Sequence, residues 1–394
     1  MVLLNKNNLL EKVFNVTTDN EPTMCKCFAD MRNGCFAHIQ SKASQKALES
    51  TSILKRTRRR MRKVAQRYHK TFKFKSMVKK KQILLKLKPK TIKQEIATRF
   101  ECTQIMMRSF LNDPNERSDS DIDLEKSKQN FFLINEAMKE TLAKKEYDKL
   151  KLSESDFNVV VNVLPTLDIL SEAINIFGGE KFCTGSIVLP FLVQFLKALD
   201  TDEDGIAYIN KFKNVLQEEI IARCAKHLNI KLLAKSSFFD KRYSKLKFLP
   251  KICEFLQVEV SCDQIIEEIR EESDMVELAD NEENFEMENP RKKKRFLGLL
   301  SDEDEVNIDG GNLDEVSRYI AEGNIENSAS PLTWWKGRKE KYPKLSCLAR
   351  KYLAVQASST ASERVFSLMG NILTKKRLRT TSENFKKLAF LYDC

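Results

Sequence analysis

The sequence predicts an α/β chain that is predominantly helical, with its few strands close to the N-terminus. Three observations carry this prediction. Residues 13–20, VFNVTTDN, form a short apolar run that ends in polar turn residues, as a buried strand does. From Ser41 to about Leu256 the apolar residues recur mostly three to five positions apart, which is typical of amphipathic helices. Only 11 Gly and 9 Pro interrupt the 394 residues, which favours long helices.

The other segments follow in chain order. Residues 1–15 have the spacing of a short helix, and residues 33–40, NGCFAHIQ, are expected to form a second short strand. Residues 112–126, NDPNERSDSDIDLEK, are typical of an exposed loop. Residues 259–327 are polar and highly charged, so we expect a segment that is disordered in large part. Order is expected to return in residues 331–355, PLTWWKGRKEKYPKLSCLARKYLAV.

Composition narrows the class of protein. Hydrophobic residues make up 42% and charged residues 31%, as in water-soluble globular chains. No stretch approaches about 18 consecutive apolar residues, so we expect no transmembrane helix and no membrane partner. The first residues lack the basic-then-apolar layout of a signal peptide. The ten cysteines have no regular spacing, which indicates reduced thiols in the cytosol or nucleus.

The charge distribution indicates a polyanion-binding surface. The formal charge is +12, and residues 41–93 hold 20 Lys and Arg against one acid, whereas residues 259–288 hold 13 acids against one base. Residues 290–295, PRKKKR, match a nuclear-import signal, so we expect a nuclear protein. The basic residues that we expect to bind nucleic acid are Arg56, Arg58, Arg59, Arg60, Arg62 and Lys63.

One short motif carries two groups that can bind a metal. Cys35 and His38 form a C-x-x-H pattern, with a Cys-x-Cys pair at residues 25–27 upstream. The Cys-x-Cys spacing is too close for a usual zinc knuckle, and no second pair follows at a suitable distance. The spacing alone therefore does not favour a structural zinc ion.

Two carboxylates have both a structural and a chemical interpretation. Asp19 follows the first predicted strand, where it fits a helix N-cap or a metal-binding carboxylate. Thr360-Ala-Ser-Glu363 has the pattern of a capping box, with Thr360 as the N-cap and Glu363 at the third helical position. Local pattern alone favours the capping interpretation for both.

Taken together, these motifs resemble the hAT superfamily of transposases. The stretch from residue 331 to residue 391 resembles the family's C-terminal dimerisation region, including Trp334, Trp335, Glu363 and Arg364. TTDN resembles the strand end with the second catalytic aspartate, and CFAHIQSKASQKAL resembles the C-x-x-H block that follows it. IATRFECTQIMMRSFL and LAKSSFFDKRYSKLKFL resemble two further blocks in the expected order. Within the superfamily the chain looks closest to the domesticated relatives of the BED-type zinc finger class.

The resemblance implies a partial RNase H-like core at residues 1–40, interrupted by a large all-α insertion at 41–258. A linker at 259–327 and a dimerisation region at 328–394, which completes the core, would follow. Asp19 and Glu363 would be two of the three carboxylates that hold magnesium, and Phe100 would replace a tryptophan that handles flipped bases. The implied dimerisation residues are Trp334, Trp335, Leu345, Leu348, Tyr352, Phe366, Leu388 and Phe390.

The sequence also departs from the family pattern. The residues before Asp19 contain no aspartate and no zinc finger. We therefore expect an N-terminally truncated, degenerate transposase whose Asp19 and Glu363 are vestigial, with no cofactor, since only a complete site would hold magnesium. The expected protein binds DNA, forms a homodimer or pairs with related hAT proteins, and transfers no strands. Two alternatives stay open: an active transposase represented by a truncated gene model, and an interaction scaffold that binds no nucleic acid.

Overall fold

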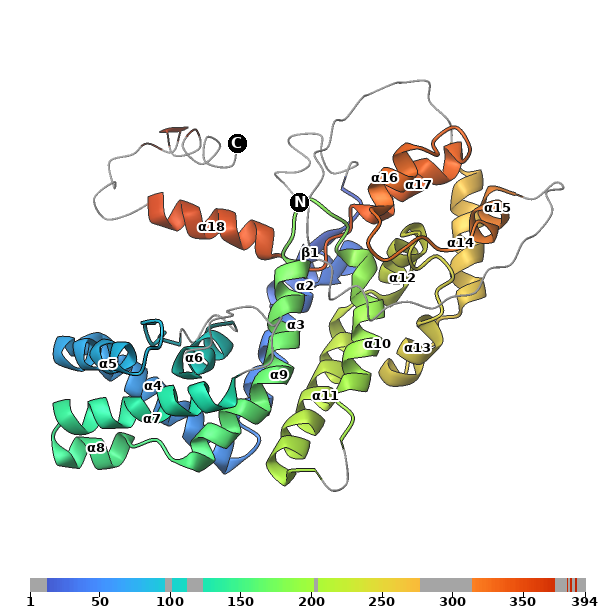
Figure 1. The fold of residues 1–394 in the computed structure, drawn as a ribbon. Coiled ribbons are helices and arrows are strands. Elements are labelled where there is room, and N and C mark those ends of the chain that lie inside the picture. The colour runs from blue at the N-terminus through green and yellow to red at the C-terminus, as the bar shows by residue number, and fades with distance from the viewer. Residues whose placement is uncertain are drawn as a thin grey trace. The chain divides into compact units, whose positions relative to one another are not determined.

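The computed structural model describes residues 13–95, 101–111, 123–201, 205–276 and 314–372, together with 381, 383, 384 and 387. The chain forms two compact units (Figure 1). Unit 1 contains Met1–Ile39, Ile176–Lys197 and Ile221–Cys394, and unit 2 contains Gln40–Asn175 and Ala198–Ile220. The residues that we expected to form one helical insertion, 41–258, are thus shared between both units.

Unit 1 begins with a two-stranded sheet. Strands β1 (Val16–Thr18) and β2 (Arg32–Gly34) pair in parallel, with Val16 opposite Arg32. The crossover between them contains α2 (Pro22–Cys27) and the 3-10 turn η2 (Ala29–Met31). β1 confirms the first predicted strand.

The second strand prediction, residues 33–40, is wrong beyond Gly34, because α3 (Phe36–Leu48) begins two residues later. Its buried residues Phe36, Ile39, Ala43 and Ala47 recur every three to four positions, which is the period of a helix and not of a strand.

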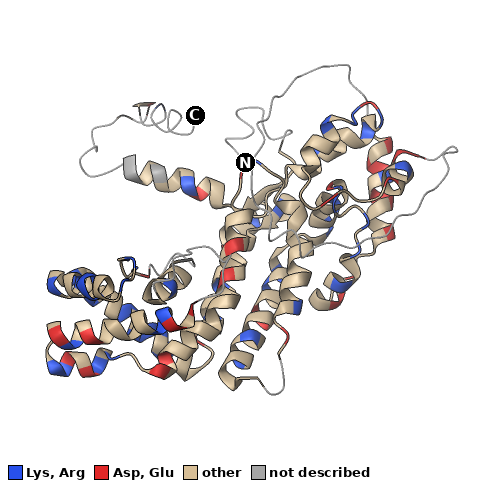
Figure 2. Cartoon of the chain, in the orientation of Figure 1, with Lys and Arg blue, Asp and Glu red and all other residues tan. Residues whose placement is uncertain are grey.

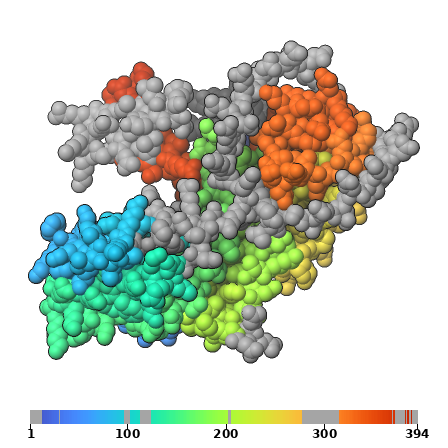
Figure 3. Space-filling model, viewed as in Figure 1, coloured from blue at the N-terminus to red at the C-terminus, as the bar shows by residue number. Residues whose placement is uncertain are grey.

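The remainder of unit 1 is helical. α12 packs on α17 and α14, and α15 packs on both α14 and α17. Figure 3 shows the orange atoms of α15 to α17 as one closely packed mass beside the yellow atoms of α14. These elements are η3 (Gly185–Ile187), α10 (Val188–Ala198), α12 (Ile230–Phe239), α13 (Leu249–Leu256), α14 (Cys262–Asp274), α15 (Glu315–Ala321), α16 (Pro331–Lys336), α17 (Pro343–Leu353) and α18 (Thr360–Ile372).

Two of these helices lie in the segment that we expected to be largely disordered, residues 259–327. α14 carries Ile265 and Ile269 four positions apart, and both side chains are buried. The hydroxyl of Ser261 accepts a hydrogen bond from Gln264 N at 3.0 Å and caps the helix. The acidic composition concealed an apolar stripe of helical period, so the prediction was wrong for the described residues 259–276 and 314–327.

Helices are the only regular secondary structure among the described residues of unit 2. α5 packs on α7 and α4, α6 packs on α7 and α4, and α8 packs on α4 and α7. Buried residues at helical spacing, among them Leu54, Met61 and Tyr68, turn one face of α4 towards these neighbours. The helices are α4 (Ser52–Lys70), α5 (Phe72–Leu84), α6 (Glu101–Leu111), α7 (Leu124–Thr141), α8 (Lys144–Leu150), α9 (Glu154–Phe177) and α11 (Ala207–His227), of which α9 and α11 continue into unit 1.

One segment passes a simple test for a membrane span, contrary to our expectation from the sequence. Lys144–Phe177, which contains α8 and α9, is long and apolar enough to cross a membrane, judged by length and composition only. Half of its most apolar stretch of 18 residues is buried inside the protein. α9 also carries the buried Asp168, which accepts hydrogen bonds from Arg108 Nε at 2.9 Å and Gln104 at 2.6 Å. A charged side chain that is buried and paired in this way fits a helix in the core of a helical domain.

Candidate functional site

Three segments that are far apart in the sequence meet in unit 1. Thr17 Oγ1 donates a hydrogen bond to the carbonyl of Gln356 at 2.8 Å. The backbone N–H of Cys35 donates to Thr18 O at 2.8 Å, and that of Phe36 donates to Ala357 O at 2.9 Å. The end of β1, the start of α3 and the segment that precedes α18 are thereby held together by hydrogen bonds.

A glycine allows the last of these segments to approach η3. A Cβ atom added at Gly185 would lie 2.6 Å from Val355 O, which is too close for any other residue. Gly185 N donates to that same oxygen at 3.0 Å. Thr184 Oγ1 accepts from Ala357 N at 3.0 Å and donates to the side chain of Gln356 at 2.8 Å. The start of α18 is therefore fixed before its first turn.

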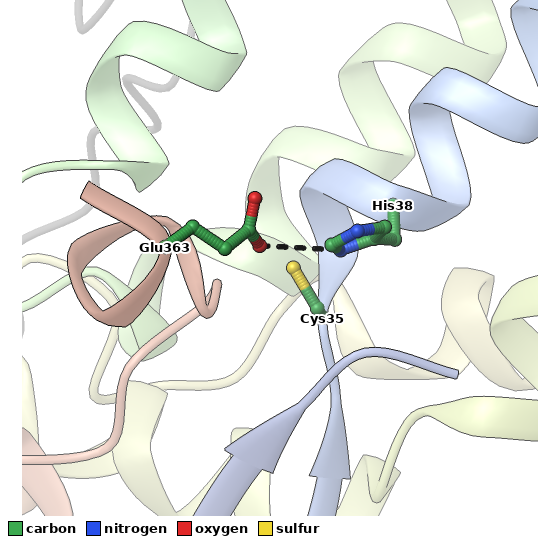
Figure 4. Close-up of side chains that lie close together, drawn as sticks. All are labelled: Cys35, His38 and Glu363. Atoms are coloured by element: carbon green, nitrogen blue, oxygen red, sulfur yellow. Dashed lines mark ion pairs between the residues drawn. The ribbon is translucent and has the colours of Figure 1, made fainter. Parts of the chain in front are cut away.

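The side chains that converge at this junction are Cys35, His38 and Glu363 (Figure 4). Cys35 follows β2, His38 lies in the first turn of α3, and Glu363 lies in the first turn of α18. One ligand atom from each lies within 4.8 Å of the other two, and His38 Nδ1 is 3.7 Å from Glu363 Oε1. Cys35 is fully buried, whereas the side chains of His38 and Glu363 are 34% and 53% exposed, so the cluster opens to solvent on one side.

Ser359 contacts two members of this cluster. Its backbone N–H donates to Cys35 Sγ at 3.3 Å, and its hydroxyl donates to Glu363 Oε1 at 2.8 Å. The predicted capping box with Thr360 as the N-cap is not formed, because α18 already includes Thr360. The hydroxyl of Thr360 pairs with that of Ser358 at 3.0 Å and so does not cap the helix.

The electrostatics of the cluster favour an ionised cysteine. Burial raises the pKa of the Cys35 thiol, but the contact with His38 and the hydrogen bonding from Ser359 outweigh it, and the pKa is lowered. The contact with Cys35 raises the pKa of His38 against the effect of burial, and the charges of Glu363 and Asp19 add to this rise. Nδ1 of His38 is buried and has no hydrogen-bond partner among the described residues.

Asp19 and Glu363 are both close enough to His38 for their charges to raise the pKa of that imidazole. Arg32 fixes the turn after β1 by donating to the carbonyl of Asp19 at 3.1 Å. The groups nearest Glu363 are nevertheless a thiol and an imidazole, and Asp19 does not join that trio at ligand distance. Magnesium prefers six oxygen ligands, so the described residues do not fit a magnesium site.

Half of the predicted nucleic-acid-binding set is engaged inside unit 2. Arg58 and Arg62 both pair with Glu95, whose side chain is 1% exposed, at 2.7 Å and 3.1 Å. Arg60 pairs with the fully buried Asp156. These three arginines lie beside two acids that are distant in sequence, so their charges are partly balanced within the fold.

The other half of the set is exposed. Arg56, Arg59 and Lys63 lie on one side of α4, and Lys70 continues the same row at helical spacing. None of these four forms an ion pair with a residue that the structure describes. Figure 2 shows α5, which has no acid, in blue and tan, whereas α7 and α8 carry both signs of charge. Phe100 lies outside the described residues.

The predicted dimerisation residues of α16 and α17 form a core within their own unit. Trp335 Nε1 donates to the carbonyl of Phe239 on α12 at 2.7 Å, and Tyr352 stacks on the ring of Phe239 at 5.4 Å. Trp334, Leu345 and Leu348 are likewise buried, at 0–8% exposure. Phe366 on α18 is different, since 69% of it is exposed. Leu388 and Phe390 lie outside the described residues.

Sequence inspection missed the most compact group of functional side chains. It identified Cys35 and His38 as a motif and Glu363 as a family residue, but it did not place them together. Ser359 falls in the stretch that resembles the family, but sequence inspection assigned it no role. The C-x-x-H pattern was a signal for the first two, since residues three apart share a helix face, but no local pattern connects residue 38 with residue 363.

Comparison with known proteins shows which family region and which proteins this chain is similar to. Residues 315–393 match the hAT family C-terminal dimerisation region. The chain is similar to the putative AC transposase of Zea mays, with 23% identity over 323 residues, or 78% of this chain and 37% of that protein. It is also similar to the putative AC9 transposase of Zea mays, with 30% identity over 178 residues, or 41% of this chain and 21% of that protein. Zinc finger BED domain-containing protein 4 of Homo sapiens is 36% identical over 76 residues, which are 19% of this chain and 6% of that protein. The chain thus spans little more than a third of the length of the AC transposase.

Proposed function

Because the chain is a transposase-like protein of the hAT superfamily, we propose that it binds DNA and self-associates in the nucleus without transferring DNA strands on its own. The observation that carries the proposal is a row of exposed basic residues on α4 that form no ion pair with a residue the structure describes. We call this row, Arg56, Arg59, Lys63 and Lys70, the α4 basic row. The import-like segment PRKKKR, which supports a nuclear location, lies outside the described residues.

The α4 basic row has the dimensions of a phosphate-binding surface. Residues 56 and 70 are 14 positions apart, which is about 21 Å along a helix. This length corresponds to about six phosphates of one DNA strand, at about 3.4 Å per phosphate along the duplex axis. The exposed Lys73, Lys75, Lys79 and Lys80 of α5 add further charge in the next helix. Four cations that form no ion pair with a described residue repel one another, and a polyanion relieves that repulsion.

A DNA-binding titration tests this part of the proposal. The full chain is titrated into a fluorescent duplex, and anisotropy gives Kd for wild type and for Arg56→Gln/Arg59→Gln/Lys63→Gln. We expect Kd to rise at least tenfold. The matched control, Lys336→Gln/Lys339→Gln/Arg350→Gln, removes the same charge from exposed positions of unit 1 and is expected to change Kd less than threefold. If both triple variants raised Kd equally, DNA binding would depend on net charge and not on the α4 basic row. If wild type bound no DNA at all, the result would favour an interaction scaffold.

The proposed fold of the core is RNase H-like. A parallel strand pair, an acid at the carboxyl end of β1 and a glutamate on the last described helix support it. The proposed absence of strand transfer rests on the donors around Glu363, which suit magnesium poorly. Incubation with magnesium or manganese and a hairpin-ended DNA should yield no specific nick, and a nick at the hairpin would contradict this part of the proposal.

Self-association is proposed to use the exposed side of α18. The helix lies within the matched dimerisation region, and Arg364 anchors its first turn by donating to Gly178 O at 2.8 Å. Phe366, on the same helix, presents a large apolar ring to solvent. Multi-angle light scattering should give a dimer for wild type and a monomer for Phe366→Glu at equal concentration. A monomeric wild type, or a variant that remains dimeric, would contradict this surface.

A further inference from the structure

Cys35, His38 and Glu363 supply a set of ligands that differs from the one the family resemblance implies. A thiolate, an imidazole and a carboxylate are the three protein ligands that zinc takes, whereas magnesium takes oxygen. The trio comes from the junction of β2 with α3 and from the first turn of α18, yet the ligand atoms all lie within 4.8 Å of one another. We propose that these three side chains form a binding site for Zn²⁺ or a similar borderline divalent ion.

The distances are close to those of a bound site. Ligand atoms at about 2.0–2.3 Å from a tetrahedral zinc ion lie about 3.3–3.6 Å from one another. The separation of 3.7 Å between His38 Nδ1 and Glu363 Oε1 is nearly that value. The limit of 4.8 Å on the remaining separations leaves at most about 1 Å of closure, and for Glu363, whose side chain is exposed, rotation can supply it.

The groups that surround the trio have the roles that outer ligands of a metal site have. Ser359 donates to the sulfur of Cys35 and to the carboxylate of Glu363, so one residue orients two ligands. His38 Nδ1 is a buried polar atom without a hydrogen-bond partner among the described residues, and an ion would satisfy it. A buried thiol, a ring nitrogen without a hydrogen bond to a described residue and a carboxylate thus lie together at one point of the fold.

The site is open, because only Cys35 is fully buried. Three protein ligands and an accessible fourth position are typical of zinc sites that bind a water or an anionic oxygen, whereas closed structural sites have four protein ligands. Glu363 is the exposed edge of the trio, at 53%, so the fourth ligand would enter there. This inference does not depend on DNA binding or on self-association.

Cobalt(II) is the probe for this site, since it takes zinc positions and produces a thiolate charge-transfer absorption. The full chain should bind one equivalent with that absorption. Cys35→Ser should abolish the absorption, and His38→Gln or Glu363→Gln should weaken affinity at least tenfold. Zn²⁺ should displace the cobalt, and excess Mg²⁺ should not. The matched controls are Cys27→Ser and Cys347→Ser, which change exposed thiols and should leave the titration unaltered.

Ser359 provides a test of the surrounding shell that does not alter a ligand. Ser359→Ala should weaken cobalt affinity about 10- to 100-fold, and Ser359→Thr, which keeps the hydroxyl, should restore most of it. Circular dichroism establishes that each variant is folded, and Glu363→Gln, which is isosteric at an exposed position, keeps the test valid if Cys35→Ser misfolds. The proposal would be overturned if wild type showed no thiolate absorption or if Cys35→Ser kept it. It would also be overturned if Cys27→Ser lost the absorption or if Mg²⁺ displaced the cobalt.

Discussion

The adjacent residues Arg59 and Arg60 are expected to respond in opposite ways to the same substitution. Arg60 pairs with Asp156, whose side chain is fully buried, whereas Arg59 is exposed and belongs to the α4 basic row. Removing one partner of a fully buried ion pair costs about 3–5 kcal/mol. Arg60 is 23% exposed, and Asp156 keeps hydrogen bonds from Thr57 at 2.6 Å and Ser153 at 2.6 Å. We therefore expect Arg60→Ala to cost about 2 kcal/mol and Arg59→Ala less than about 0.5 kcal/mol.

Thermal melts followed by circular dichroism measure this difference. For a unit of this size, about 2 kcal/mol corresponds to a fall in Tm of about 4–8 °C. Anisotropy on the same samples should give the opposite order, with Arg59→Ala weakening DNA binding more than Arg60→Ala. Equal melting temperatures for the two variants, or weaker DNA binding from Arg60→Ala at an unchanged Tm, would refute the assignment of Arg60 to the core.

The pH dependence gives this prediction a second check. Burial raises the pKa of Asp156, but hydrogen bonds from Ser153 and Thr57 and the charge of Arg60 outweigh it and lower the pKa. A lowered acid pKa stabilises the fold above the unfolded value of about 3.9, and that stabilisation is lost as the pH falls through the folded value. The difference in stability between wild type and Arg60→Ala should therefore be full near neutral pH and shrink below about pH 4. A difference that is constant across this range would contradict the ion pair.

Three other residues give shorter predictions. Trp335→Phe removes the hydrogen bond to a buried carbonyl and should cost about 1–3 kcal/mol in urea unfolding without altering the oligomeric state; dissociation of a dimer without loss of stability would contradict the core assignment. Burial lowers the pKa of Lys241 to about 7, below the unfolded value of about 10.4. Wild type should therefore gain stability relative to Lys241→Met as the pH rises from about 7 to 10, by at most about 1.4 kcal/mol per pH unit. A difference in urea midpoints that stays constant over this range would contradict this. Burial raises the pKa of Glu272, but hydrogen bonds from Lys235 and Tyr352 outweigh this effect, and the pKa is lowered. The loss of stability in Glu272→Gln should therefore fade below about pH 4 in thermal melts. A loss that persists below that pH would count against the pairing.

Features that depend on neighbouring residues could be predicted from the sequence. β1 and the helices of unit 2 follow the local period of apolar residues, which needs no knowledge of the remainder of the chain. The same logic failed where composition concealed period, as in α14, whose two buried isoleucines lie among acids. It also extended a strand across the start of α3, where the helical spacing of Phe36 and Ile39 was too short to recognise.

Features that depend on contacts between distant residues could not be predicted. Nothing local distinguishes Arg59 from Arg60, because the partner of Arg60 lies 96 positions away. Apolar residues at helical spacing, such as Trp335, fit a core and an interface equally well, and only the packing on α12 assigns this one to the core. The family resemblance brought Asp19 and Glu363 to one region, but the distance of residue 363 from residue 38 is a product of tertiary structure.

The salt dependence of DNA affinity tests the central claim most directly, because it counts phosphate contacts. Log affinity falls linearly with log salt, with a slope of about −0.9 for each phosphate contacted. Anisotropy titrations from about 50 to 200 mM salt should therefore give Arg56→Gln/Arg59→Gln/Lys63→Gln a slope that is shallower than that of wild type by about 2.7. A slope equal to that of wild type would contradict the proposal that the α4 basic row holds the DNA backbone.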